Sequence, residues 1–258
     1  MPRITIGSES FNVAIDGPDG APVLMLSNSL GASLAMWDQQ MPVWSKAFRV
    51  VRYDSRGHGG STAPDRPYSI AELGRDALGI MDALGLKEVN WCGLSKGGMV
   101  GMWLLTHAPQ RIRRAVLANT SAKMGPPDIW NARIRTAREQ GMTVMSEAMR
   151  PRWFSEAFNA TGAPEIDRIL GLIRSQPPHG YAGCCAAIRD MDQREAIRAI
   201  DRPVMVIIGA KDPATPPAAG ELIASRIAGA RTVVLDAAHL SNVEQPDSFG
   251  SAVLEFLS

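Results

Sequence analysis

Short apolar runs recur along the chain, and amphipathic segments fill most of the intervals between them. The runs cover residues 22–28, 48–54, 89–93, 113–120, 203–209 and 231–238. A strand that is buried on both faces has such a continuous run, because neither face meets water. Apolar residues recur with helical spacing in several intervals, most clearly over residues 70–85. The alternation predicts an α/β fold with a mostly parallel, doubly wound sheet.

Two regions depart from this alternation. The stretches ITI and FNVAID near the start are short and separated by a turn, which predicts a β-hairpin. Residues 123–199 contain no strand-like run, and this interval is far longer than a simple crossover needs. We therefore expect a helical cap at 123–199, inserted into one core formed by residues 1–122 and 200–258. The alternative is a set of ordinary crossover helices.

The composition of the chain limits the classes of molecule that it is expected to bind. The 258 residues are 45% hydrophobic with a net charge of +1, so no bulk field attracts nucleic acid or an anionic membrane. The chain shows neither a secretory signal nor an apolar run that could span a bilayer. Its three cysteines, Cys92, Cys184 and Cys185, make a poor disulfide framework. We expect a cytoplasmic protein with a small-molecule partner; the sequence predicts no oligomeric state.

The segment GLSKG at residues 93–97 fits the pattern G-x-S-x-G, between a predicted buried strand and a predicted helix. A serine at such a bend takes a strained conformation that directs its hydroxyl away from the sheet, and nearby side chains must be absent. The free amides at the start of the helix favour a developing negative charge. Ser95 is therefore predicted to be a nucleophile, with a plain tight turn as the alternative.

A serine hydroxyl needs a base, and in this arrangement the chain order is serine, acid, histidine. His239 follows the last predicted strand, at the same sheet edge as Ser95, and is the predicted base. For His58, His107 and His179 we expect structural roles. No metal site is expected, because the chain has no CxxC or HExxH pattern.

The predicted acid is Asp212, which lies three residues after the run 203–209. There its carboxylate would hold the imidazole in the tautomer that accepts the serine proton. The alternative is a turn aspartate before Pro213. Asp190 and Asp236 are poorer candidates because they fall in the predicted cap and the predicted last strand.

An oxyanion requires two N–H donors. The first is expected from the backbone of Lys96, whose side chain we expect to be solvated. The second is expected from the loop SNSLGAS, at Leu30, with Ser29 as the alternative. The stretch 53–61, YDSRGHGGS, is expected to form a structural turn without a catalytic role.

The whole chain resembles the α/β-hydrolase superfamily. The segments SNSLGASLAMWDQQ, GLSKGGMVG, WNARIR, PPHGYAGCCAAIRDMD and AAHLSNVEQP look like those of 3-oxoadipate enol-lactonases, which act in the β-ketoadipate pathway of aromatic catabolism. The resemblance implies a carboxylic ester hydrolase that needs no cofactor and opens an anionic lactone through a Ser-His-Asp acyl-enzyme mechanism. Lys96 departs from the family, because Met, Leu or Gln is usual after the serine.

An anionic substrate needs a cation in the pocket. In the predicted helix DIWNARIRTAREQG, Trp130, Ile134 and Ala137 share one stripe, and Arg133 intrudes on it. A guanidinium on that face could bind a substrate carboxylate, or it could form a structural ion pair. Trp130 and Trp153 are predicted to wall the pocket, with plain packing as the alternative.

Two rival functions stay open. One is another serine hydrolase of this fold, such as a neutral esterase, a carbon–carbon-bond hydrolase or a perhydrolase. The other is a ligand-binding receptor that retains the triad and turns over slowly. An aspartate nucleophile is not available, because residue 95 is serine.

Overall fold

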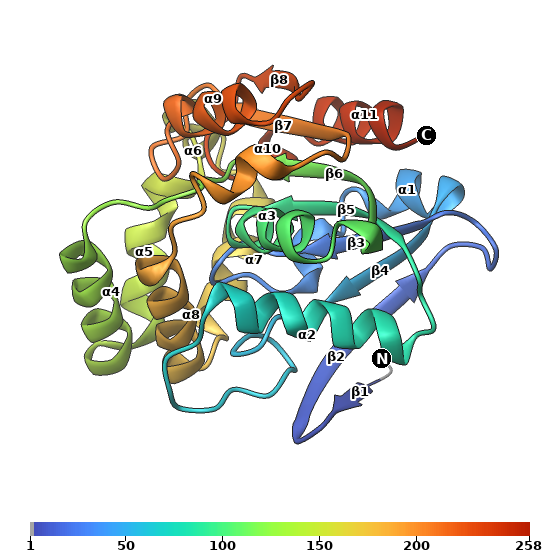
Figure 1. Ribbon diagram of the computed structural model, residues 1–258. Helices are drawn as coiled ribbons and strands as arrows, with labels where there is room; N and C mark the ends of the chain where they lie inside the picture. Colours follow the sequence, from blue (N-terminus) through green and yellow to red (C-terminus); the bar gives the residue numbers. More distant parts are fainter. Residues whose placement is uncertain (1–2) are drawn as a thin grey trace.

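The computed structural model describes residues 3–258 and contains one eight-stranded sheet (Figure 1). Its strand order is β1-β2-β4-β3-β5-β6-β7-β8. The strands β1 and β2 form the predicted antiparallel hairpin, β2 also pairs antiparallel with β4, and the other pairs are parallel. The predicted α/β sheet is confirmed. The strands are β1 (Arg3–Ile6), β2 (Glu9–Asp16), β3 (Val23–Ser27), β4 (Arg49–Tyr53), β5 (Val89–Leu94), β6 (Ile112–Ala118), β7 (Val204–Gly209) and β8 (Arg231–Leu235).

Helices cover both faces of the sheet. In Figure 1, α2 and α3 lie in front of it, and α3 packs on β5 and β6. On the other side α11 packs on β6 and β8, and α1 packs on α11 and β4. The core helices are α1 (Met41–Ala47), α2 (Ile70–Ala83), α3 (Lys96–His107), α9 (Pro217–Arg226), α10 (Ser241–Glu244) and α11 (Pro246–Leu257).

Five α-helices lie between β6 and β7 and are called the cap below. They are α4 (Pro127–Glu139), α5 (Gly141–Trp153), α6 (Glu156–Ala160), α7 (Pro164–Arg174) and α8 (Pro178–Asp190). Within the cap, α4 packs against α8 and α5 against α7. Figure 1 shows α4, α5 and α8 together at one end of the sheet, away from both chain ends. The division at residues 123 and 199 stays a prediction.

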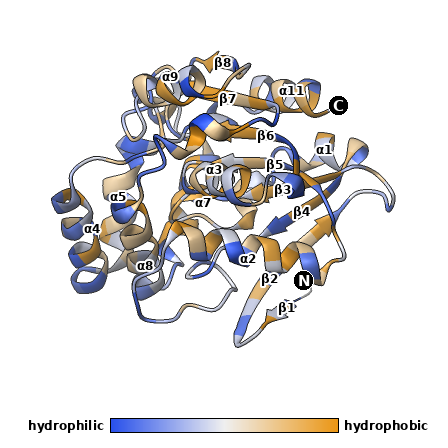
Figure 2. Cartoon of the chain, viewed as in Figure 1, coloured by the Kyte–Doolittle hydropathy of each residue, from blue (hydrophilic) through white to orange (hydrophobic). Residues whose placement is uncertain are grey.

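Burial explains why the apolar runs locate the strands. Every residue of β5 and of β7 is buried, because helices cover both faces of these central strands. In Figure 2 the central strands are mostly hydrophobic, whereas α4 alternates between hydrophilic and hydrophobic turns. Each fully buried aliphatic side chain contributes roughly 1.5–3 kcal/mol by leaving water. Within residues 3–258, no helix is long and apolar enough to cross a membrane.

Candidate active site

Ser95 lies at the bend between β5 and α3 in a strained backbone conformation. Its φ is 58° and its ψ is −115°, in the left-handed region that a residue with a side chain rarely adopts. A Cβ atom at Gly93 would overlap the backbone of Gly97, and a Cβ at Gly97 would overlap the backbone of Ser27. The two glycines therefore allow the close approach that the bend requires, and the predicted strained turn is confirmed.

His239 and Asp212 are brought together from the loops after β8 and β7. The His239 Nδ1 atom lies 2.8 Å from the Asp212 Oδ2 atom. The carboxylate also accepts hydrogen bonds from Thr215 Oγ1 at 2.7 Å, from the amides of Thr215 and Ala214, and from Asn119 Nδ2 at 3.1 Å. This arrangement places a proton on Nδ1 and leaves Nε2 available as a base.

The pKa of Asp212 reflects two opposing effects. Burial raises it, whereas the charge of His239 and the hydrogen bonds from His239 and Thr215 lower it. The second effect prevails, so the pKa of Asp212 lies below its ordinary value. Both Ser95 and His239 line the same cavity, although no hydrogen bond joins their side chains among the described residues. Such bonds are often long before substrate binds.

The backbone amides of Leu30 and Lys96 are unused donors. Within residues 3–258 neither amide has a hydrogen-bond acceptor. Leu30 and Ser29 line the cavity beside Ser95. Free amides at a loop and at a helix start can hold a developing oxyanion.

The Lys96 side chain contradicts the sequence expectation. It is buried rather than solvated, and its Nζ atom has no hydrogen-bond partner among the described residues. Burial lowers the pKa of this amine. The expectation was wrong because helix α3 starts inside the fold, where all of its first residues are covered.

A cavity of about 420 Å³ lies between the core and the cap. We call the core residues that line it the floor and the cap residues the roof. The roof comes from α4, α5 and α8, so the cavity joins the three substrate-binding candidates to Ser95 and His239. The floor includes Ser29, Leu30, Ser95, Thr215 and His239, and the roof includes Trp130, Arg133, Met149, Arg152, Trp153, Tyr181 and Ile188.

The roof holds two arginines without carboxylate partners. The Arg133 guanidinium lies 4.7 Å from the ring centre of Trp130, and the structural ion pair considered above is not found within residues 3–258. Arg152 also lacks an ion pair there, and its buried Nε has no acceptor. Burial and the nearby charge of Arg133 lower the pKa of Arg152. The Tyr181 hydroxyl is also buried without a partner in the described chain.

Sequence reasoning missed Arg152 and Tyr181. Arg152 lies beside Pro151 in α5, where the helical pattern is interrupted. Tyr181 lies in the first turn of α8, a helix that is buried nearly all round. The one signal in the sequence was that Arg152 directly precedes Trp153, which was already a candidate for the pocket wall.

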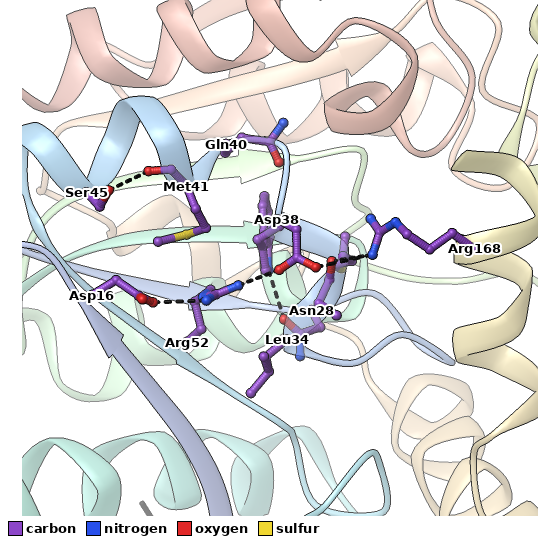
Figure 3. Close-up of polar contacts among 12 residues, drawn as sticks. Asp16, Asn28, Leu34, Asp38, Gln40, Met41, Ser45, Arg52 and Arg168 are labelled. Carbon is purple, nitrogen blue, oxygen red and sulfur yellow. Dashed lines mark hydrogen bonds and ion pairs between the residues drawn. The ribbon is translucent and has the colours of Figure 1, made fainter. Parts of the chain in front are cut away.

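The loop that follows β3 is held from several sides. Its Asn28 side chain donates to the backbone carbonyl of Tyr53 at 2.8 Å. Further along, Asp38 pairs with Arg52 of the sheet at 2.7 Å and with Arg168 of the cap at 3.3 Å (Figure 3). The segment beside the oxyanion donors is therefore tied to both parts of the molecule.

The remaining candidates lie elsewhere. His107 is stacked on Trp103, with ring centres 4.6 Å apart. Asp236 follows β8 rather than lying in it, which corrects the expectation, and its carboxylate pairs with Lys211 at 2.7 Å. In the part of the chain that the structure describes, no group of three or more His, Cys, Asp or Glu residues could hold a metal ion.

The fold and the arrangement of residues around Ser95 are those of one class of protein, the alpha/beta hydrolases. The chain belongs to the alpha/beta hydrolase family, whose model of the alpha/beta hydrolase fold matches residues 22–246. It is 38% identical to 3-oxoadipate enol-lactonase 2 of Acinetobacter baylyi over 97% of this chain and 94% of that protein.

Two solved structures agree with this relationship. The enol-lactonase from Burkholderia xenovorans LB400 is 42% identical with a TM-score of 0.97, and the match covers 99% of each chain. A hydrolase from Pseudomonas aeruginosa PA01 is 45% identical with a TM-score of 0.97, covering 100% of this chain and 98% of that one. The resemblance to 3-oxoadipate enol-lactonases inferred from the sequence is confirmed.

Proposed function

We propose that this hydrolase opens 3-oxoadipate enol-lactone to 3-oxoadipate, as a carboxylic ester hydrolase of the β-ketoadipate pathway in aromatic catabolism. The observation that carries the proposal is an unpaired guanidinium, that of Arg133, in the roof above Ser95 and His239. A half-buried cation without a carboxylate partner favours an anionic ligand. The enol-lactonases among the relatives support the choice of anion.

In the first half of the proposed reaction, the Ser95 hydroxyl attacks the lactone carbonyl while His239 Nε2 takes its proton. The amides of Leu30 and Lys96 hold the resulting oxyanion. The ring C–O bond then breaks, and the departing oxygen takes the proton from His239 Nε2 and leaves as an enol that stays tethered to the acyl chain. An enol is a better leaving group than an alkoxide, so it needs less help from a general acid.

The second half releases the product. His239, now neutral again, removes a proton from water as the water attacks the acyl carbonyl. The acyl–oxygen bond then breaks, and His239 returns the proton to the Ser95 oxygen, which restores the hydroxyl. The released enol becomes the ketone, and this change opposes reclosure of the ring. The chemistry uses no cofactor. We place it in the cytoplasm, because Cys92, Cys184 and Cys185 are all free and buried.

The first test is kcat/KM of the purified protein for 3-oxoadipate enol-lactone beside a neutral lactone of the same ring size. We expect a preference of about 10–100-fold for the anionic lactone, as one charge-assisted contact provides. Equal or negligible rates on both lactones would overturn the proposed substrate.

Adding neutral ester and perhydrolysis substrates and a measurement of lactone affinity separates the two rival functions. An ester or perhydrolysis substrate turned over faster than the lactone would favour another serine hydrolase of this fold. Tight lactone binding with very slow turnover would favour a receptor that retains the triad.

A further inference from the structure

The loop that carries the Leu30 amide is supported from behind by a buried histidine. The backbone N–H of Gly31, the residue after Leu30, donates to His58 Nε2 at 2.8 Å. The His58 side chain is completely buried. Gly31 has a φ of +85°, a conformation that suits glycine, so the chain turns sharply at the point where His58 holds it. This hydrogen bond therefore fixes the position of the Leu30–Gly31 junction.

The hydrogen bond requires one form of the imidazole. Because Nε2 accepts a hydrogen bond from the Gly31 N–H, it carries no proton itself, and the ring proton must lie on Nδ1. The Nδ1 atom faces the carbonyl oxygen of Arg56 at 3.4 Å and Cys184 Sγ at 3.8 Å. Burial and the charge of Lys96 lower the pKa of His58 well below its ordinary value, which keeps the ring neutral.

The other anchors hold the ends of this loop. Asn28 at its start donates to Tyr53, and the amide of Leu34 at its end donates to Asp54 Oδ1 at 2.7 Å; Asn28 and Leu34 are labelled in Figure 3. Beside the Leu30 amide, Ser29 makes two hydrogen bonds within the loop region, from its N–H to Met36 Sδ at 3.3 Å and to its carbonyl from the Ala32 N–H at 3.2 Å. The bond from Gly31 to His58 is the one there that ties the loop to a separate segment of the chain. A change at His58 therefore reaches the Leu30 N–H group directly, whereas the outer anchors act through two or more residues.

The turn that carries His58 also contacts the cap. The amide of Gly59 donates to Gln176 Oε1 at 2.7 Å. At Gly57, an added Cβ atom would lie 2.6 Å from the carbonyl oxygen of Gly180 in α8, so the two backbones are in close contact. The turn therefore contacts the Leu30 loop on one side and the cap on the other. Such a fixed position suits a residue that supports the Leu30 amide.

We infer that His58 is a positioning residue for the oxyanion hole: its neutral imidazole accepts from Gly31 and so directs the Leu30 N–H group toward the oxyanion. The inference rests on the proposed role of Leu30. Misplacing a catalytic donor by about 1 Å costs up to about 100-fold in rate. Since the donor acts on the oxyanion rather than on the bound substrate, the loss falls on kcat more than on KM.

The test compares His58→Leu, which has no acceptor, with His58→Gln, which retains an amide oxygen. Ile80→Ala in the buried face of α2 is the control for a loss of stability alone. Rates are measured for the lactone and for p-nitrophenyl acetate, and affinity is measured for phenylboronic acid, which forms a tetrahedral adduct with the serine. We expect His58→Leu to lower kcat and boronic acid affinity by about 10–100-fold with little change in KM, and His58→Gln to recover most of the loss.

A folded His58→Leu protein with normal kcat and normal boronic acid affinity would overturn the inference, as would an equal kcat loss in Ile80→Ala. If His58→Leu does not fold, the nitrogen chemical shifts of His58 in the unaltered protein test the inference, because they report which ring nitrogen carries the proton. A protonated Nε2 or a doubly protonated ring would contradict the inference. Because p-nitrophenyl acetate reports on the triad whatever the natural substrate is, failure of the lactone proposal leaves this test intact.

Discussion

The floor and the roof of the cavity differ in whether the charged side chains there have partners. Behind the floor, the Asp212 carboxylate accepts hydrogen bonds from the floor residues His239, Thr215 and Ala214, and from Asn119. In the roof, the Arg133 and Arg152 side chains have no carboxylate partner within residues 3–258. Both surfaces border the same cavity, but Asp212 is buried behind the floor whereas the two arginines are half-buried.

The difference separates two tasks. A catalytic acid–histidine pair works best when it is fixed before the substrate arrives, because no reorganisation is then needed during the reaction. A recognition site gains selectivity when its charge waits for a ligand, because a ligand without the matching group leaves that charge buried and unpaired. We therefore expect floor substitutions to affect turnover and roof substitutions to affect the choice of substrate.

The largest expected effect is that of Ser95→Ala, which removes the proposed nucleophile. We expect kcat for the lactone to fall by about four to six powers of ten, since other groups cannot replace the covalent step. The melting temperature should stay close to that of the unaltered protein, because the small alanine fits the same bend. Near-normal kcat in a folded variant would show that Ser95 is not the nucleophile.

The second effect concerns the roof. Arg133→Gln removes the proposed contact to the substrate carboxylate, and a charge-assisted hydrogen bond is worth about 1.5–3 kcal/mol. We expect KM for the anionic lactone to rise by about 10–100-fold, while kinetics on a neutral lactone stay nearly unchanged. The matched control is Arg135→Gln on the same helix, since Arg135 is exposed to solvent and does not line the cavity. Equal changes in both variants would place the anion contact elsewhere.

Much of the floor could be predicted from the sequence. Continuous apolar runs identify the parallel strands, because a strand covered on both faces contains few polar residues. Ser95, Asp212 and His239 each lie within three residues of the end of such a run, so their common sheet edge could be inferred without coordinates. The catalytic roles of these three residues stay predictions.

The roof and the supports of the floor could not be predicted in the same way. The burial of Lys96 depends on tertiary contacts around the start of α3, and nothing local distinguishes it from a surface lysine. His58 and Gly31 are far apart in the chain, and their hydrogen bond follows from the packing of two loops. Arg152 faces the cavity because of how α5 lies over the core, which periodicity does not describe.

A third, smaller effect is expected from Arg152→Met. The charge of Arg152 is partly buried, unpaired and close to Arg133, which is unfavourable while the cavity holds no anion. We expect the variant to gain about 0.5–2 kcal/mol of stability, as in other cases where function and stability conflict. The affinity for the anionic lactone should fall by about 3–10-fold, which is less than one full charge-assisted contact. A lower melting temperature would show that Arg152 supports the fold.

The smallest expected effect is that of Thr215→Val, which tests the floor. The Thr215 hydroxyl donates to Asp212 Oδ2 at 2.7 Å, and its loss costs about 1 kcal/mol of stability. Because the folded pKa of Asp212 lies below its unfolded value of about 3.9, ionised Asp212 stabilises the fold above that pH. This stabilisation is lost as the pH falls through the folded pKa.

Thr215→Val should raise the folded pKa toward the unfolded value and shrink this contribution. The difference in unfolding free energy between the two proteins should therefore be largest near neutral pH, and it should diminish as the acid range is entered. Denaturant unfolding at a series of pH values measures it. A difference in unfolding free energy that is independent of pH would mean that Thr215 stabilises the fold by packing alone. The hydrogen bond from Thr215 to Asp212 would then contribute less to stability than its short length indicates.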